Sequence, residues 1–324
     1  MKKRKGLGWF IGGRVLQFVL ILWAASVLIF AMCHISQIDP VAVILGGKQT
    51  SAETIAALRE KFHLNDSLTM QYWRWISGML QGDFGLDFKY QQPVWNLIAG
   101  RLPVTLSLTV FSSVLAMIIA IPLGVFSGVK GHTAWDRSAS LLSLITMACP
   151  PFFISVIAIA IVANVAPGIS FTGTFHTLGE MIDRLWLPGV CLALGMIALA
   201  QRIVRSSMID EMKSPHIQMA QAKGLPQKTV IWKHAFKNAL VPLITVCGIQ
   251  MGSMLVGAVL VESVFSLAGL GGLLVSAVQT SNYPVTQAIT MIMVFVFLLI
   301  STVTDILYAV IDPRIRTGKG GSHE

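Results

Sequence analysis

The sequence predicts an all-α, polytopic membrane protein with six transmembrane helices. Charged residues make up 12% of its 324 residues and hydrophobic residues 54%, whereas charged residues are about 25% of a typical soluble protein. A helix needs about 20 apolar residues to cross a membrane, and one charge at its centre costs about 2.5–3.5 kcal/mol. Long runs without Asp, Glu, Lys or Arg therefore mark the spans, and they lie at 15–38, 102–129, 138–179, 185–201, 238–261 and 263–304.

These runs place the six helices at about 14–35, 104–127, 138–165, 186–207, 239–261 and 285–309. Both ends of the chain are basic, with Lys2, Lys3, Arg4 and Lys5 at one end and Arg314, Arg316 and Lys319 at the other. Loops rich in Lys and Arg stay in the cytoplasm, so we expect both termini there and an even number of crossings.

The chain then divides into five parts: a cytoplasmic N-terminus (1–13), a first transmembrane helix (14–35), an extracytoplasmic segment (36–100), a membrane domain (101–311) with a cytoplasmic loop (208–238), and a cytoplasmic tail (312–324). The first helix follows basic residues, as a signal peptide does. Its apolar stretch from Val15 to His34 exceeds the 7–15 residues of a signal core and lacks a small-x-small cleavage site. We therefore expect it to remain as a span. His34, at its outer end, is either an ordinary interfacial residue or a contact for a metal or a peptide.

The extracytoplasmic segment is predicted to contain two short helices. Thr50 and Glu53 have the spacing of a capping box, and Ile55, Leu58 and Phe62 after them share one face of a helix. A second helix is expected from Leu68 to Leu80, with Met70, Trp73 and Ile76 turned toward the membrane or the first helix. The segment suits a packed cap on the outer face, a docking surface for an external partner, or both.

Prolines and glycines modify the later spans. Pro150 and Pro151 fall near the middle of the third span, where proline removes helix hydrogen bonds, so we expect this helix to bend or break. Pro188 suits the first turn of the fourth span. The stretch from Val264 to Val278 is apolar enough for a seventh span, but its glycines and the even number of crossings favour a short helix that dips in from outside.

The distribution of charge indicates topology rather than nucleic-acid binding. The net charge is +9, and on the predicted topology the basic excess lies on the cytoplasmic face, next to anionic lipid headgroups. The loop from Arg202 to Lys237 alone carries seven Lys or Arg residues against Asp210 and Glu211. We expect membrane lipid as a partner and no nucleic acid.

The sequence contains no residues arranged for catalysis, and we expect neither an enzyme nor a bound cofactor or metal. It has no GxSxG, HExxH or P-loop motif, since Gly47-Lys48 is followed by Gln49. The four cysteines, at 33, 149, 191 and 247, fall in predicted spans without CxxC spacing. Of the ionisable residues, Glu262 and Asp305 come closest to the inside of a span, which argues against an ion-coupled secondary transporter. Any transport by this chain would then need energy from elsewhere.

The basic loop carries a motif as well as charge. Pro215 and Gly224-Leu225-Pro226 bracket a short helix, expected at 218–223, whose Ala220 and Ala222 would keep its exposed ridge thin. The run Gln218-Met219-Ala220, followed by Gly224, resembles the EAA loop of ATP-binding-cassette (ABC) importer permeases. Further segments resemble the dipeptide, oligopeptide and nickel branch of that family: Gly82-Asp83-Phe84-Gly85, Leu102-Pro103-Val104-Thr105-Leu106, Asn238-Ala239-Leu240-Val241-Pro242, Asn282-Tyr283-Pro284-Val285-Thr286-Gln287 and Asp312-Pro313-Arg314-Ile315-Arg316. The chain departs from the family at Ala268-Gly269-Leu270-Gly271 and at Ser281-Asn282.

The resemblance implies a type I ABC importer permease fold, with the type-1 transmembrane domain at 101–311, in the inner membrane of a bacterium. It implies that the loop holds a coupling helix that fits a cleft of an ATPase subunit. It also implies a second, homologous permease, two ATP-binding subunits and an extracytoplasmic substrate-binding protein. The expected cargo is a di- or oligopeptide, with nickel or a metal chelate as the alternative. The ATPase-coupling residues are expected to be Gln218, Met219, Ala220, Ala222, Lys223, Gly224 and Leu225.

Overall fold

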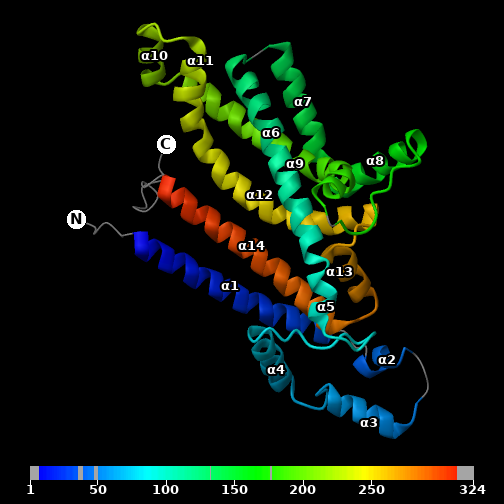
Figure 1. Cartoon of the computed structure of the whole chain (residues 1–324). Helices are drawn as coiled ribbons and strands as arrows, with labels where there is room; N and C mark the ends of the chain where they lie inside the picture. Colours follow the sequence, from blue (N-terminus) through cyan, green and yellow to red (C-terminus); the bar gives the residue numbers. More distant parts are fainter. Residues whose placement is uncertain (1–6, 36–38, 47–49, 132, 176, 312–324) are drawn as a thin grey trace.

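The computed structural model describes residues 7–35, 39–46, 50–131, 133–175 and 177–311, and this part of the chain is built of helices joined by loops (Figure 1). Apart from two isolated bridge pairs, the described residues form no strand. The predicted all-α class is therefore confirmed. The helices are α1 (Leu7–Ile35), α2 (Pro40–Leu45), α3 (Ala52–Lys61), α4 (Leu68–Leu80), α5 (Val94–Ala99), α6 (Leu102–Val129), α7 (Ala134–Ala148), α8 (Pro151–Val165), α9 (Leu178–Met212), α10 (Pro215–Ala222), α11 (Gln227–Thr229), the π-helix η1 (Val230–Ala235), α12 (Phe236–Phe265), α13 (Leu270–Gln279) and α14 (Tyr283–Ile311).

Five stretches of the described chain are long and apolar enough to cross a membrane, in α1, α5 with α6, α9, α12 and α14. The pair α7 and α8 makes a sixth if the two helices count as one broken span. The structure thus agrees with a polytopic membrane protein of up to six spans. The basic residues before Leu7 and the tail at 312–324 lie outside the described residues.

The core of the bundle lies between α6, α9 and α12. Leu108, Cys191, Met196 and Ala258 are among its buried side chains. Helices α6 and α9 approach so closely at Gly124 that a Cβ on this residue would lie 2.6 Å from Cβ of Val204. Small residues permit this backbone approach between membrane helices.

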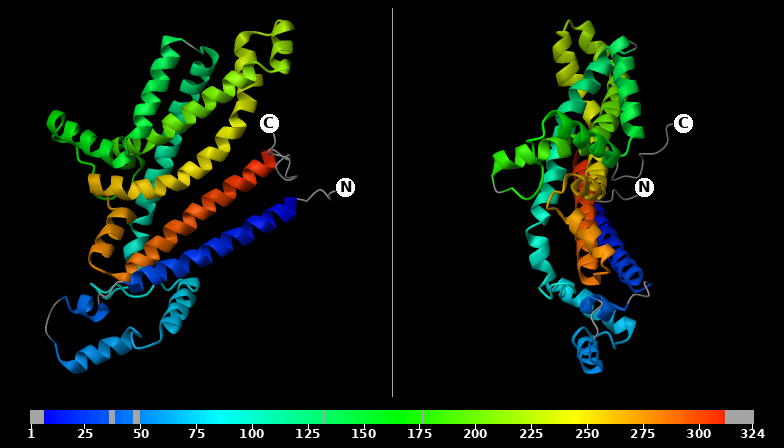
Figure 2. Two further views of the ribbon diagram at one scale, coloured as in Figure 1. Left: turned by 180° about the vertical axis from the view of Figure 1, so that it is seen from behind. Right: turned by 90° about the vertical axis from the view of Figure 1, so that its right-hand side faces the viewer.

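Helices α1 and α14 form a second layer, side by side in both figures (Figures 1 and 2). Arg14 Nη1 lies 3.0 Å from Asp305 Oδ2, and this ion pair joins the beginning of α1 to the end of α14. Phe18 and Phe295 pack edge to face 5.6 Å apart farther along the same pair. Asp305, which the sequence places near the end of a span, is therefore one half of an ion pair between two helices.

Two ends of the molecule can be distinguished. Helices α2 to α5, here called the cap, lie at one end, and α10 and α11 lie at the opposite end (Figures 1 and 2). We call these the cap end and the α10 end. The first residues of α1 and the last residues of α14 lie toward the α10 end (Figure 1).

The third span breaks at the prolines, as the sequence predicts. Helix α7 ends at Ala148, Cys149 is extended with ψ 120°, and α8 starts with Pro151. The axes of α7 and α8 differ by 101°, so the change of direction is a full break rather than a kink. Figure 1 shows α8 projecting from the side of the bundle.

Pro188 does not begin the fourth span, so that prediction was wrong. Helix α9 already starts at Leu178, where the Thr177 hydroxyl accepts the N–H of Glu180 at 3.2 Å. The charged residues Glu180, Asp183 and Arg184 interrupt the apolar sequence, so the prediction started the helix after them. A helix can nevertheless continue through charged residues where it lies outside the membrane. Leu187 before the proline and Cys191 after it are both buried in the core, which fixes the helix on both sides of the proline.

The cap contains both predicted short helices. Helix α4 spans Leu68–Leu80, the range expected from the sequence. Helix α3 is capped by Ser51, whose hydroxyl accepts the N–H of Thr54 at 3.3 Å, and not by Thr50. The predicted N-cap was therefore one residue too early. Serine and threonine are both good N-cap residues, so the sequence alone did not distinguish Thr50 from Ser51.

His34 has a structural role. One ring nitrogen, Nδ1, lies 2.8 Å from the carbonyl oxygen of Phe30, and Nε2 lies 3.3 Å from Oε1 of Gln71. The ring stacks on Phe30 with centroids 4.0 Å apart. His34 therefore joins the end of α1 to α4, which supports the interpretation of an ordinary residue at the end of the span.

The short helix α13 is fixed by two residues of other helices. Thr105 Oγ1 accepts the N–H of Leu270 at 2.8 Å, and Glu262 Oε2 accepts the N–H of Gly271 at 2.7 Å. Glu262 is fully buried, and a carboxylate at a helix N-terminus interacts favourably with its free N–H groups. A Cβ on Gly269 would lie 2.2 Å from the same carboxylate oxygen. The departure Ala268-Gly269-Leu270-Gly271 thus keeps the two glycines that this contact requires.

Candidate coupling surface

The predicted coupling residues lie on α10 and the turn after it, at the end of the molecule opposite the cap (Figure 2). The segment enters from α9 and leaves through α11 and η1 into α12. It is therefore held between two helices that run through the bundle.

Helix α10 begins earlier than expected, at Pro215, with Ser214 as its N-cap. Proline suits this first position because its missing N–H would have no partner inside the helix. The helix ends at Ala222, and Gly224 adopts φ +75°. This left-handed conformation favours glycine, and the Leu225 N–H donates to the carbonyl of Ala220 at 3.3 Å. The expected helix, at 218–223, began three residues too late and ended one residue too late. The motif begins at Gln218, so it gave no sign of the first turn at 215–217.

One face of α10 packs on the bundle. Ile217 is fully buried and Ala220 is 8% exposed. They belong to a cluster with Met208 of α9, Val230 of η1 and Ala120 of α6. The expectation that Ala220 lies on the exposed ridge is therefore wrong, and this alanine is small because it fits between helices.

The other face of α10 is open. Met219 is 60% and Leu225 39% exposed, and both are apolar side chains on a surface otherwise made of polar and small residues. The remaining exposed positions of this ridge are Gln218, Gln221, Ala222, Lys223 and Gly224. Six of the seven predicted coupling residues thus share one exposed surface, which we call the α10 ridge.

The same segment carries basic side chains before, within and after the ridge. Lys213, Lys223, Lys228, Lys233 and Lys237 are all exposed. Trp232 on η1 is 46% exposed and packs edge to face on Phe236, 5.2 Å away. Sequence reasoning missed Trp232, although an aromatic residue between two lysines of a basic loop was a usable signal.

Glu211 ties the two flanking helices to α10. Its Oε1 accepts the amide N–H of Asn238 at 2.7 Å and lies 2.8 Å from Nε2 of His216. The Ser214 hydroxyl donates to the carbonyl oxygen of Glu211 at 2.6 Å. Glu211 was noticed in the sequence only as one of two acids in a basic loop. The structure shows that it connects the end of α9, the start of α10 and the start of α12.

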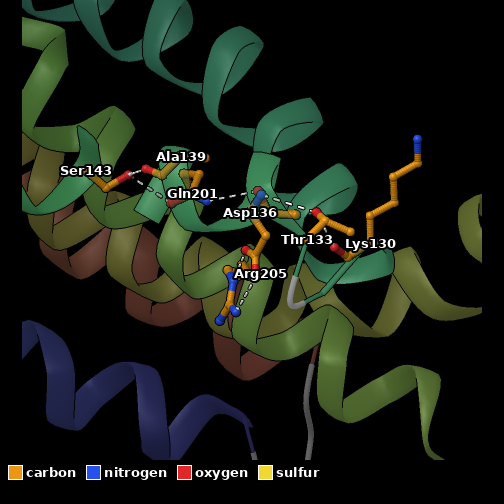
Figure 3. Close-up of polar contacts among 8 residues, drawn as sticks. Lys130, Thr133, Asp136, Ala139, Ser143, Gln201 and Arg205 are labelled. Atoms are coloured by element: carbon orange, nitrogen blue, oxygen red, sulfur yellow. Dashed lines mark hydrogen bonds and ion pairs between the residues drawn. The ribbon is translucent and has the colours of Figure 1, made fainter. Parts of the chain in front are cut away.

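A polar network continues from α9 into the bundle (Figure 3). Arg205 donates two hydrogen bonds to Asp136 of α7, Nε to Oδ1 at 2.5 Å and Nη2 to Oδ2 at 2.7 Å. One turn deeper, Oε1 of Gln201 accepts the hydroxyl of Ser143 at 2.9 Å, and its Nε2 donates to Ser127 at 3.4 Å. The network joins α6, α7 and α9 near the α10 end.

Asp136 and Arg205 were not identified as a pair from the sequence. They lie just outside two charge-free runs, and opposite charges in such matching positions are a signal that could have found them. The side chain of Asp136 is 3% exposed and that of Arg205 26%. Burial of this kind requires a partner, and the bidentate geometry of arginine supplies one.

No group of three or more His, Cys, Asp or Glu side chains lies close enough to hold a metal ion in the parts of the chain that the structure describes.

Comparisons with known proteins identify the family of this chain. Residues 120–317 match the family described as binding-protein-dependent transport system inner membrane component, and residues 8–109 match its N-terminal family. The oligopeptide transport system permease protein AppB of Bacillus subtilis is 36% identical over 309 residues, covering 93% of this chain and 97% of the relative.

Two other relatives carry different names. The dipeptide transport system permease protein DppB of Alkalihalophilus pseudofirmus is 32% identical, covering 94% of this chain and 98% of the relative. The nickel import system permease protein NikB of Staphylococcus aureus is 30% identical, covering 95% and 92%. The chain therefore belongs to the binding-protein-dependent inner-membrane transport family, as a multi-pass ABC importer permease of the peptide and nickel type.

Proposed function

We propose that this permease imports di- or oligopeptides and that two separate ATP-binding subunits drive it through the α10 ridge. The observation that carries the proposal is the two-sided nature of α10. Its exposed side offers Met219 and Leu225 in a segment that also carries several exposed lysines, while Ile217 and Ala220 fix its other side to the bundle. A helix built in this way suits a partner with an apolar cleft and an acidic rim.

The proposed mechanism is a rigid-body movement. ATP binding would close the two ATPase subunits, and the cleft of one of them would carry α10 of this chain with it. The cluster of Ile217, Met208 and Val230 passes this displacement to α9 and η1. Asp136 and Arg205 pass it to α7. Small movements at one site reach distant helices in this manner when packed elements have two alternative arrangements.

The proposal includes an orientation and further partners. The termini, the α10 end and the loop at 208–238 face the cytoplasm, and the segment at 36–100 faces outward. The outward face receives cargo from an extracytoplasmic substrate-binding protein. A second, homologous permease completes the pathway. The lysines around α10 support this orientation because cytoplasmic loops hold the excess of basic residues.

Peptide is our proposed cargo. The relatives whose names specify oligopeptide and dipeptide are 36% and 32% identical to this chain, and the one named for nickel is 30% identical. These values lie close together, so nickel import is retained as the second candidate on the strength of the third relative.

The cargo test uses the complete importer in liposomes with ATP inside and its binding protein outside. Uptake of a radiolabelled dipeptide or pentapeptide, without uptake of nickel, is the expected result. Uptake of nickel without peptide contradicts the peptide proposal and selects the second candidate.

The energy test uses two further preparations. Liposomes that contain this chain alone should show no uptake under an imposed ion gradient, whereas gradient-driven uptake would indicate a secondary transporter. In the complete importer, Met219→Asp should release the ATPase subunits during purification, because it places a charge at an apolar contact. Ala57→Asp, at an exposed position of α3 in the cap, is the matched control and should leave the complex intact.

A further inference from the structure

We propose that a groove between α1, α4 and α14 binds one acyl chain of a membrane phospholipid, and that α4 rests on the membrane surface as an interfacial helix. The lipid would come from the leaflet next to the cap. This inference requires the membrane location of the chain but not the cargo or the ATPase contact.

The groove has a volume of about 520 Å³ and an almost entirely apolar wall. Val19, Leu22 and Trp23 line it from α1, and Met291, Ile292 and Phe295 line it from α14. Helix α4 closes it with Ile76, Met79 and Leu80. The polar group of Ser26 also lies here, but its hydroxyl donates to the carbonyl of Trp23 at 2.7 Å and bonds to Tyr72 at 2.9 Å.

The position of α4 explains why the groove exists. The first half of α4 is held on α1, because Tyr72 packs edge to face on Phe30 at 5.4 Å and bonds to Ser26. The second half, from Ile76 to Leu80, faces the groove instead of the helix. An apolar gap is therefore left under the end of α4.

The groove lies along the part of α1 that can occupy the hydrocarbon core. Ser26 and Val19 precede the end of α1 at Ile35, and at a rise of 1.5 Å per residue they lie about 14 and 24 Å from it along the helix axis. A hydrocarbon core is about 30 Å thick. Water at this depth finds few polar partners in such a wall, whereas an acyl chain fits it.

The groove is continuous with the membrane-facing surface of α1. Val19 is 53% and Trp23 61% exposed. Only 11% of the most apolar 18-residue stretch of α1 is buried in the protein. On α4, Trp73 is 67% and Leu80 84% exposed. Exposed tryptophan and leucine on one helix face are typical of helices that lie in the membrane interface. Lipid therefore already covers the surface into which the groove opens.

The test uses the full chain in phosphatidylcholine vesicles that contain a phospholipid with a photoreactive diazirine at the end of one acyl chain. We expect labelling concentrated on peptides that contain 19–26, 76–80 and 291–295. Val19→Trp fills the groove and should lower this labelling about tenfold, the effect of about 1.4 kcal/mol in binding. Leu28→Trp, on the opposite side of α1 and 63% exposed, should leave it unchanged.

Two results would overturn the proposal. The first is equal labelling around Val19 and Leu28, or no decrease in a Val19→Trp variant whose melting temperature is normal. The second comes from intact-mass spectrometry of the purified chain, which should detect one retained phospholipid. Detection of a free fatty acid or detergent in its place would contradict the proposed source.

Discussion

Arg205 of α9 holds Asp136 of α7 with two hydrogen bonds of 2.5 and 2.7 Å, one helix turn from the buried Gln201 (Figure 3). The pair lies between the α10 ridge and the middle of the bundle. It therefore joins the helix that leads into the ridge to the helix that breaks at Pro150.

Arg205→Ala should destabilise the protein strongly. It leaves the carboxylate of Asp136 buried without its main partner, and breaking a buried ion pair costs about 3–5 kcal/mol. We expect a value near the lower limit because the guanidinium group is partly exposed. Thermal unfolding followed by tryptophan fluorescence measures the change.

The double variant Asp136→Asn, Arg205→Gln supplies the control. It replaces the ion pair with two neutral groups, so no charge is left buried. The double variant should be more stable than Arg205→Ala, with a coupling of about 0.5–3 kcal/mol in the full cycle. Additive losses would show that the two side chains do not depend on each other.

The same substitution should destabilise the protein at one alanine of α10 and leave stability nearly unchanged at another. Ala220→Leu places a larger side chain in the packed cluster with Ile217 and Val230, which costs about 1–3 kcal/mol. Ala222→Leu adds the same atoms on the exposed ridge and should change stability by less than about 0.5 kcal/mol. If the proposed coupling is correct, Ala222→Leu nevertheless lowers the ATPase activity of the assembled importer.

The control for this pair is Ala57→Leu, at an exposed position of α3 in the cap. It should retain both stability and most of the ATPase activity. Equal stability of the two leucine variants would contradict the orientation of α10. Normal ATPase activity in Ala222→Leu would contradict the role of the ridge.

Two neighbouring glycines of α13 provide a third test. A Cβ on Gly271 would lie 2.4 Å from Cα of Val259, whereas a Cβ on Gly272 would approach no atom closer than 3.9 Å. Gly271→Ala should therefore displace α13 from α12, at a cost of about 1–3 kcal/mol. Gly272→Ala should be neutral or stabilise the helix by up to about 1 kcal/mol. Limited proteolysis around 266–283 measures the displacement, and similar cleavage of both variants would contradict the packing.

Gly224 tests the conformation of the turn. Its φ of +75° is unfavourable for a residue with a side chain, with a cost of about 1–2 kcal/mol. Gly224→Asn should cost less than Gly224→Val because asparagine tolerates this region. Melting temperatures in the order Gly, Asn, Val are expected, and equal values for all three would show that the turn relaxes.

The sequence predicted features that depend on local chemistry. The spans follow from the absence of charge, the break at Pro150 follows from missing helix hydrogen bonds, and the bounds of α4 follow from its flanking residues. Features that depend on packing between helices were missed. Pro188 lies inside α9 because core contacts hold both sides of it, and Ala220 is buried because η1 and α9 cover it.

The same distinction applies to the coupling surface. The residues of the ridge could be found from a short motif, since they are consecutive in the sequence. Its support could not, because Glu211 and Asn238 are 27 positions apart and meet through the path of the chain. Asp136 and Arg205 are separated by 69 positions. A single sequence contains no measure of such distances.

The central claim is that an ATPase subunit binds the α10 ridge. A photoreactive amino acid at position 219 of the permease, in the assembled importer, tests it most directly, with position 73 in the cap as the control. After illumination, we predict a covalent adduct between the permease and an ATPase subunit from position 219 and none from position 73. No ATPase adduct from position 219 in an intact complex, or equal adducts from both positions, would contradict the claim.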